Sequence, residues 1–262
     1  MPTTARADLP TRALPEGFEI EDWPSGKAVV ITGGSTGIGR ALAILLGSRG
    51  ARVVICGRHE PELDDTMEYL DGLGVDARAV AVDISEPDDV ERLFQVADEF
   101  LGGIDLLVNN AALPAEDVAG TDVESITYIV SSNLLGPMYC THHALARMRP
   151  RRSGTIVTVG SMSADVREQG SSVYVATKSA LQGFSGALRK EVSEDGIRVV
   201  LVQPGSVGTD MNEQSPEDQR RSEAAEEMMK AEDVALVVLG ALCMPARADV
   251  VQVDVRPQRQ LI

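Results

Sequence analysis

The feature that most constrains the fold of this chain is a regular alternation, beginning at residue 27, of short apolar runs with longer segments of helical periodicity. The apolar runs that we expect to form strands span residues 28–31, 52–56, 77–82, 104–108, 155–159, 197–202 and 250–255. The segments that we expect to form helices span residues 38–48, 61–70, 88–100, 123–147, 170–190 and 232–242. Strands that alternate with helices build βαβ units, whose strands are parallel. We therefore predict an α/β fold, a doubly wound parallel sheet with helices on both faces.

The composition agrees with such a sheet. Of the 262 residues, 44% are hydrophobic but only 3% are aromatic, so the core must consist mainly of Val, Leu, Ile and Ala. These residues suit parallel strands that are covered on both faces, and a chain of this length can bury a sizeable core within a single domain. The formal net charge of -16 disfavours a nucleic-acid partner, which would require a basic surface. The acid excess favours solubility and is also compatible with a salt-loving source.

The segments outside the alternating pattern predict a soluble protein. Residues 1–26 are rich in Pro, Thr and charged residues, so we expect an N-terminal extension that is partly flexible and packs near Trp23 onto the domain formed by residues 27–262. The extension contains no apolar run of the signal-peptide type. The longest apolar run, residues 234–244, is too short to span a bilayer, so we expect no membrane partner.

The cysteine and histidine positions predict a reducing compartment and no metal site. Cys56, Cys140 and Cys243 are odd in number and widely spaced, without the pattern of a disulfide framework or of metal ligands. His142 and His143 are adjacent, so on a helix they point in different directions and form a poor metal pair. Buried free thiols are typical of cytoplasmic proteins, and we expect this protein to be one.

A glycine-rich turn follows the first predicted strand and opens the first predicted helix. Its sequence is Thr32-Gly33-Gly34-Ser35-Thr36-Gly37-Ile38-Gly39. Glycines let the backbone turn tightly and approach a ligand closely, and the free N–H groups of a helix N-terminus attract an anion. At this place in a βαβ pattern the turn predicts a dinucleotide pyrophosphate site, the alternative being a plain tight turn. The residues expected to contact the cofactor here are Gly33, Ser35, Thr36, Gly37, Ile38 and Gly39.

The end of the second strand favours NADP (NADPH) over NAD. NAD sites usually place an acid here to bind the ribose 2′-hydroxyl, whereas an arginine accommodates a 2′-phosphate. This chain has Gly57-Arg58, and Arg58 can pair with phosphate, although a solvated loop charge is the alternative. Further cofactor contacts are expected beyond the third and fourth strands, because ligands bind at the carboxyl ends of parallel strands. These residues are Asp83, Ile84, Asn109 and Ala111, although Asp and Asn at strand ends are also common turn formers.

Tyr174 and Lys178 are separated by one helical turn and therefore point the same way. A lysine ammonium about 4 Å from a phenolate, at an effective dielectric of about 20, stabilises it by roughly 4 kcal/mol. Even half of that energy would lower the pKa of Tyr174 by more than one unit and bring it toward the range of a general acid or base. The alternative is a half-buried ring beside a solvated amine.

Together these residues resemble the short-chain dehydrogenase/reductase family over residues 27–255. The motifs that carry the resemblance are Thr-Gly-x-x-x-Gly-Ile-Gly from Thr32 and Tyr-x-x-x-Lys from Tyr174. The resemblance implies a Rossmann-like seven-stranded sheet and an NADP-dependent enzyme. Such an enzyme transfers a hydride between nicotinamide and a carbonyl or secondary alcohol of a small molecule. Tyr174 would be the general acid/base, and Lys178 would bind the nicotinamide ribose and help to lower the pKa of Tyr174.

The resemblance implies further site residues and also has departures. Ser161 would hydrogen-bond the reacting carbonyl, and Asn133 would hold a water for proton relay through Lys178. The loop after the sixth strand would orient the nicotinamide carboxamide through Pro204, Gly205, Val207 and Thr209. Ala112 stands where the family usually has glycine. Residues 255–260 resemble instead the ending of a subgroup that contains 3-hydroxy acid and serine dehydrogenases.

The substrate and the partners are less constrained. We expect the pocket to be lined by Met162, residues 113–116, residues 167–170 and the segment after Thr209, with residues 214–230 as a lid. Arg167 is either a ligand of a substrate carboxylate or a solvated charge. The helices at 123–147 and 170–190 carry small and apolar residues on more than one face, which predicts a homodimer or homotetramer. The alternatives for function are an NAD-dependent dehydrogenase of the same family and a non-catalytic NADP-binding regulatory protein.

Overall fold

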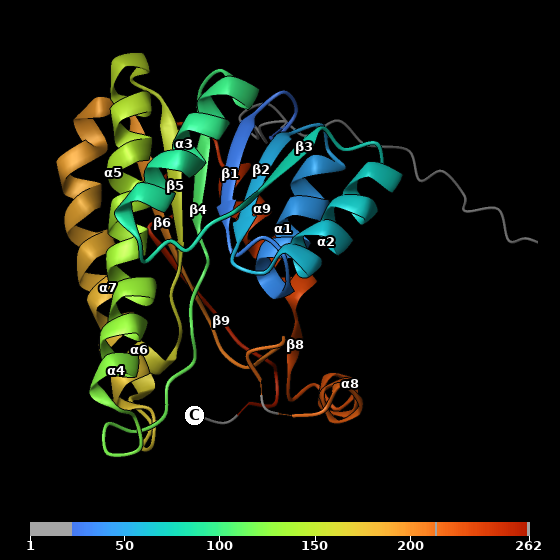
Figure 1. Ribbon diagram of the computed structural model, residues 1–262, viewed down its shortest axis with the longest axis vertical. Coiled ribbons are helices and arrows are strands. Elements are labelled where there is room, and N and C mark those ends of the chain that lie inside the picture. Colours follow the sequence, from blue (N-terminus) through green and yellow to red (C-terminus); the bar gives the residue numbers. More distant parts are fainter. Residues whose placement is uncertain (1–22, 213, 261–262) are drawn as a thin grey trace, which may run out of the picture.

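The computed structural model describes residues 23–212 and 214–260, so most of the extension predicted at residues 1–26 lies outside the described residues. Its centre is a seven-stranded sheet in the order β3-β2-β1-β4-β5-β6-β9 (Figure 1), in which every neighbouring pair is parallel. The strands are β1 (Ala28–Thr32), β2 (Arg52–Gly57), β3 (Ala77–Ala81), β4 (Leu106–Asn109), β5 (Gly154–Val159), β6 (Ile197–Pro204) and β9 (Gln252–Val255). This confirms the predicted doubly wound α/β fold, whose strand order reverses between β1 and β4.

Helices cover both faces of the sheet. One layer contains α1 (Gly37–Gly47), α2 (Glu60–Gly72) and α9 (Ala231–Leu242), and the opposite layer contains α3 (Pro87–Leu101), α5 (Gly136–Met148) and α7 (Ser172–Val192). Each layer buries its own aliphatic cluster against the strands. Because both faces are covered, all five residues of β1 are buried, which explains the continuous apolar run in the sequence.

The helix predicted at 123–147 is not continuous. The structure divides it into α4 (Val123–Val130), a π-helical turn (Ser131–Leu135) and α5. At the start of α5 the backbone passes close to the segment that follows β3, because a Cβ on Gly136 would lie 2.8 Å from both the side chain and the carbonyl oxygen of Ile84. A π-helical turn inserts an extra residue into a helix and is frequent at functional sites.

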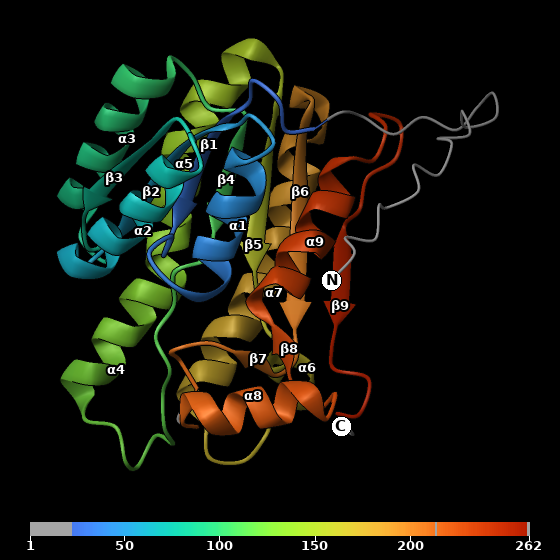
Figure 2. The same cartoon turned by 90° about the vertical axis from the view of Figure 1, so that its right-hand side faces the viewer.

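Smaller elements that the sequence pattern did not predict lie beyond the carboxyl ends of the strands. They are α6 (Ser163–Val166), α8 (Pro216–Ala224) and a two-stranded sheet of β7 (Val207–Gly208) and β8 (Met229–Lys230). Figure 2 shows β7, β8 and α8 beyond the tips of β6 and β9. At the other end, Trp23 is 5% exposed within the cluster that contains α9, and the Cys243 thiol donates to its carbonyl oxygen.

Candidate active site

A cavity of about 740 Å³ lies where the carboxyl ends of the strands meet. Its walls come from the glycine-rich turn, from the segments that follow β2 to β6, and from α7. The predicted site residues that line it are Gly33, Ser35, Thr36, Gly37, Ile38, Arg58, Asp83, Ile84, Ala111, Ser161, Tyr174, Lys178, Pro204, Gly205, Val207 and Thr209. The fold therefore brings together the cofactor residues and the Ser161, Tyr174 and Lys178 group, although they are spread over 177 positions of the sequence.

Three predicted residues, Gly39, Asn109 and Asn133, do not line the cavity. Gly39 is a packing position, because a Cβ there would lie 2.0 Å from the carbonyl oxygen of Gly33. The buried amide of Asn109 turns away and donates to the hydroxyl of Thr141 in α5 at 3.0 Å. Successive residues of a strand point to opposite faces, so the next residue, Asn110, faces the cavity instead.

Asn110, which sequence reasoning missed, joins the end of β4 to the glycine-rich turn. Its side-chain Nδ2 donates to the carbonyl oxygens of Thr32 at 3.0 Å and Gly33 at 2.9 Å. The hydroxyl of Thr32 accepts from the backbone N–H groups of Asn110 at 3.0 Å and Ala111 at 3.1 Å. These bonds hold Gly33 at a φ of 62°, a conformation that favours glycine. The adjacent residues Asn109 and Asn110 indicated that an amide lies at this strand end. The sequence did not show which of the two amides binds the glycine-rich turn.

The glycine-rich turn fits the pyrophosphate of a dinucleotide. Thr36 precedes the first residue of α1, but its hydroxyl donates to Asp210 at 3.0 Å instead of capping the helix. The first N–H groups of α1 therefore remain available to an anion, and the helix dipole favours negative charge there. A Cβ on Gly33 would lie 2.8 Å from the Cα of Ala111, so no side chain can occupy this part of the turn.

At the other end of the cavity, Arg58 belongs to a three-residue bridge. Its guanidinium donates to the hydroxyl of Tyr128 in α4 at 2.6 Å, and that hydroxyl donates to the carboxylate of Asp83. The guanidinium carbon also lies 5.7 Å from the centre of the Tyr128 ring. Burial and the bond to Asp83 raise the pKa of Tyr128, so its hydroxyl keeps its proton. Tyr128 was missed because no local pattern relates it to Arg58, which is 70 positions away.

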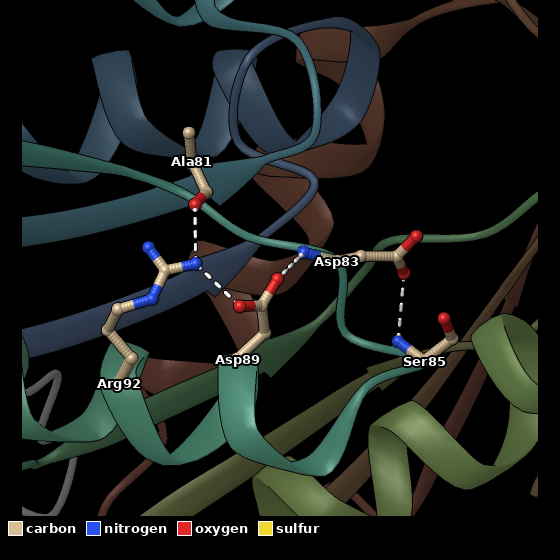
Figure 3. A network of polar contacts seen from close by, with 5 residues as sticks. All are labelled: Ala81, Asp83, Ser85, Asp89 and Arg92. Atoms are coloured by element: carbon tan, nitrogen blue, oxygen red, sulfur yellow. Dashed lines mark hydrogen bonds and ion pairs between the residues drawn. The ribbon is translucent and has the colours of Figure 1, made fainter.

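The backbone around Asp83 is held by α3 (Figure 3). The N–H of Asp83 donates to the carboxylate of Asp89 at 2.8 Å, and the N–H of Ser85 donates to the Asp83 carboxylate at 2.9 Å. Arg92 bonds Asp89 at 2.6 Å and the carbonyl oxygen of Ala81 at 3.1 Å. Burial alone would raise the pKa of Asp83, but the hydrogen bonds from Tyr128 and Ser85 hold it below its usual range. The cavity thus has a fixed carboxylate beside the Arg58 guanidinium.

Ser161, Tyr174 and Lys178 meet where β5 and α7 face the cavity. Ser161 and Tyr174 both line the cavity, and the Ser161 hydroxyl acts to lower the pKa of Tyr174. Lys178 Nζ donates to the carbonyl oxygen of Val159 at 2.9 Å. Nζ lies 5.5 Å from the centre of the Tyr174 ring. A protonated phenol and a serine hydroxyl that face the same cavity can together bind a carbonyl oxygen, and the phenol can protonate it.

The expected lowering of the Tyr174 pKa is not found. Burial raises the pKa of Tyr174 and outweighs the hydrogen bond from Ser161, which lowers it. Burial also lowers the pKa of Lys178 to about 8. The expectation failed because it counted the attraction between the two groups but not the cost of taking both out of water. The ammonium is also directed at Val159 rather than at the phenol oxygen.

The side chain of Asn133 hydrogen-bonds the backbone of the segment that follows β4. Its Oδ1 accepts from the N–H of Leu113 at 2.7 Å, and its Nδ2 donates to the carbonyl oxygen of Leu113 at 2.8 Å. The residue is 1% exposed and lies in the π-helical turn. Its side chain therefore positions the Leu113 backbone, which lines the cavity, and does not itself face the cavity.

Part of the set of residues expected to contact the substrate lines the cavity. From the predicted ranges, Leu113, Pro114, Ala115 and Glu168 line the cavity, as do Met211, Asn212 and Gln214 after Thr209. Met162 and Arg167 do not line it, and Arg167 is exposed with its Nε donating to the carbonyl oxygen of Ala164 at 3.4 Å. Ser163, which was not among the residues expected in the pocket, does line the cavity. Within the predicted lid, α8 is tied to the cavity wall by Gln219, which donates to the carbonyl oxygen of Thr209 at 3.1 Å.

The described part of the chain contains neither a cluster of metal ligands nor a helix that could span a membrane. The rings of His142 and His143 are perpendicular, and His143 stacks on Phe94 at 5.2 Å. Residues 23–212 and 214–260 contain no group of three or more His, Cys, Asp or Glu that could hold a metal ion. Over the same ranges, none of the helices combines the length and the apolar character needed to cross a bilayer.

Comparison with known proteins decides the family. Residues 27–220 match the family model described as short chain dehydrogenase. The chain belongs to the short-chain dehydrogenase family. This short-chain dehydrogenase is 30% identical over 233 residues to an uncharacterized oxidoreductase of Staphylococcus aureus (strain USA300), covering 88% of the chain and 97% of the relative. It is 37% identical over 193 residues to a 3-oxoacyl-[acyl-carrier-protein] reductase of Bos taurus. This match covers 73% of this chain and 80% of the relative.

Solved structures resemble this short-chain dehydrogenase closely. A short chain dehydrogenase from Burkholderia cenocepacia, crystallised in complex with NADP, superposes with a TM-score of 0.79 at 29% identity, covering 90% of this chain and 98% of that one. A dehydrogenase/reductase from Sinorhizobium meliloti gives the same TM-score and identity, and the match covers 89% of this chain and 95% of that one. The protein is therefore an oxidoreductase with the fold of a nicotinamide-dependent family.

Proposed function

We propose that this protein is an NADP-dependent oxidoreductase that acts on a carbonyl or secondary alcohol of a small molecule. The observation that carries the proposal is that Ser161, Tyr174 and Lys178 face the same cavity as the glycine-rich turn. The nicotinamide, when bound, supplies or accepts the hydride. The protein binds and orients the substrate and moves the proton.

Tyr174 is the proposed proton donor in the direction of reduction. Burial raises its pKa, so the phenol is protonated near neutral pH and can give its proton to the carbonyl oxygen. Ser161 lines the cavity with Tyr174, so its hydroxyl is proposed to contact the same oxygen. Lys178, placed one turn from Tyr174, would bind the nicotinamide ribose. A water relay that passes Asn133 and Lys178 stays a prediction from the family resemblance.

The proposed preference for NADP rests on Arg58. Its exposed guanidinium lines the cavity directly after β2, where an NAD site usually has an acid. Tyr128 holds that guanidinium, and Asp83 lies on the far side of the Tyr128 hydroxyl. The pyrophosphate would lie on the glycine-rich turn, and Pro204, Gly205, Val207 and Thr209 would hold the nicotinamide end. The NADP complex of the Burkholderia cenocepacia relative supports this assignment.

The test is oxidation of NADPH and of NADH in the presence of a panel of aldehydes, ketones and 3-oxoacyl thioesters, the last suggested by the Bos taurus relative. We expect turnover with NADPH and a higher affinity for NADPH than for NADH. Turnover with a preference for NADH would support the NAD-dependent alternative. Tight binding of NADPH without turnover of any compound would instead support a non-catalytic regulatory protein.

We also propose that the protein works in the cytoplasm as a homodimer or homotetramer. Cys56 and Cys140 are buried free thiols, which suit a reducing compartment. On the outer side of α7, a Cβ added at Gly183 or Gly186 would meet no atom within 4 Å, so small residues leave this surface open to a second subunit.

A further inference from the structure

The charged side chains that line the cavity are divided unequally between its two ends. In the described part of the chain they are Arg58, His59, Glu62, Asp83, Glu168, Lys178 and Asp210. The first four follow β2 and β3, at the end where the adenosine would lie. Asp210 is bonded to Thr36 beside the glycine-rich turn, and Lys178 is buried against Val159. Glu168 is thus the charged group left beside Ser161 and Tyr174.

Glu168 is linked to the reacting hydroxyls through Ser163. The Ser163 hydroxyl donates to Glu168 Oε1 at 2.5 Å, and the Ser163 N–H donates to the hydroxyl of Ser161 at 3.1 Å. Ser161 in turn lines the cavity with Tyr174, and the charge of Glu168 contributes to raising the pKa of Tyr174. Among the described residues, Glu168 Oε2 receives no hydrogen bond, so it is free to accept one from a ligand.

Among the described residues, no lysine or arginine side chain pairs with the carboxylate of Glu168. The neighbouring Arg167 does not line the cavity and donates to the carbonyl oxygen of Ala164. The wall formed by Leu113, Pro114 and Ala115 is apolar. Apart from the buried Lys178 ammonium, which is bonded to Val159, the described residues at this end of the cavity therefore combine a hydrocarbon surface with the negative charge of Glu168.

We propose that the substrate is a carbonyl compound, or the corresponding secondary alcohol, that carries a protonated amine, and that Glu168 binds this ammonium group. A charge-assisted hydrogen bond to the carboxylate would orient the substrate while Ser161 and Tyr174 contact its oxygen. The formal net charge of -16 would also attract a cationic substrate and repel an anionic one. This inference rests on the proposed oxidoreductase function and specifies its substrate class.

The experiment compares three ketones of equal chain length that end in an ammonium, a methyl or a carboxylate group, each reduced with NADPH. We expect kcat/KM for the ammonium compound to exceed that for the methyl compound roughly 10- to 100-fold, the range of a hydrogen bond to a charged group. In Glu168→Gln the two values should become nearly equal, mainly through a higher KM for the ammonium compound. Glu191→Gln, an exposed carboxylate on α7, is the matched control and should keep the wild-type preference.

Calorimetric binding of the amino alcohol product in the presence of NADP gives a readout that does not depend on turnover, and the affinity should fall in Glu168→Gln. Equal kcat/KM for the ammonium and methyl compounds in the wild type, or a preference for the carboxylate, would overturn the inference. So would an equal loss for all three compounds in Glu168→Gln, because Glu168 would then act through Tyr174. If none of the compounds is reduced and the wider panel is also inert, it is the proposed function that fails.

Discussion

Among single residues, Tyr128 stands out because its hydroxyl lies between the guanidinium of Arg58 and the carboxylate of Asp83. Arg58 is otherwise exposed, and a free arginine side chain would lose rotamer entropy when it binds a phosphate. Tyr128 holds the guanidinium at the cavity before the cofactor arrives. It is therefore a positioning residue for the proposed 2′-phosphate contact.

We expect Tyr128→Phe to weaken the affinity for NADPH by about 3- to 10-fold, with a smaller effect on NADH. Fluorescence titration with both cofactors measures this, and Arg58→Ala should give the same selectivity change with a larger magnitude. If Tyr128→Phe weakens both cofactors equally, the hydroxyl acts through Asp83 and not through Arg58.

The buried ammonium of Lys178 predicts an effect of pH on stability. Its pKa in the folded protein is about 8, below the usual value of 10.5, so the folded state binds fewer protons than the unfolded state between these values. The burial of Lys178 therefore destabilises the fold most below about pH 8, and this cost fades as the pH rises. Lys178→Met should raise the free energy of unfolding more at pH 7 than at pH 9, with a difference of roughly 1 kcal/mol.

Urea denaturation of both proteins at the two pH values measures this double difference, in which the effects of all other groups cancel. A difference of zero, or a larger gain at pH 9, would show that the ammonium is not desolvated in the folded protein.

At the scale of residues, the sequence predicted which types of side chain meet but not how each is used. The glycine-rich turn and the Tyr-x-x-x-Lys spacing could be recognised because each motif lies within a short stretch of sequence. Asn110 and Tyr128 were missed because their partners are distant in the sequence, at Thr32 and Asp83. The pKa of Tyr174 was predicted in the wrong direction because burial is a property of the whole fold.

At the scale of elements, the π-helical turn between α4 and α5 places Asn133 against the segment that follows β4. Both backbone groups of Leu113 are bonded to its amide. We expect Asn133→Ala to lower the free energy of unfolding by about 1–3 kcal/mol, because the partly buried backbone groups of Leu113 lose their partner. The displaced Leu113 segment should also raise KM more than it lowers kcat.

Denaturant unfolding and steady-state kinetics test this expectation, and Ser131→Ala, in the same turn, provides a comparison. Unchanged stability in Asn133→Ala would contradict the bracing role of the amide.

The elements of the sheet and its two helix layers could be predicted because each has a clear apolar periodicity. The π-helical turn could not, because one extra residue barely alters the apolar pattern of a helix. The segment from Pro216 to Ala224 is dominated by charged residues, so α8 has no apolar stripe by which to recognise it. The two-residue strands β7 and β8 form by pairing with each other, and neither has a local sequence pattern that predicts it.

At the scale of the whole molecule, the open surface of α7 bears on assembly. Light scattering should give two or four times the 27.9 kDa mass of one chain. Gly186→Arg should shift the protein toward monomer, because the added side chain would project from a surface that now has space for a neighbour. A wild-type protein that is monomeric at micromolar concentration would contradict the proposed assembly.

The proposed mechanism depends most on the phenol of Tyr174, and one comparison tests the role of this group directly. NADPH-dependent reduction is measured for the wild type and Tyr174→Phe, together with NADPH affinity, using Tyr139→Phe as control. We predict that kcat/KM falls by at least about 10²-fold in Tyr174→Phe, with cofactor affinity within a few-fold of the wild type. Reduction that continues at a rate near that of the wild type would contradict the assignment of Tyr174 as the proton donor.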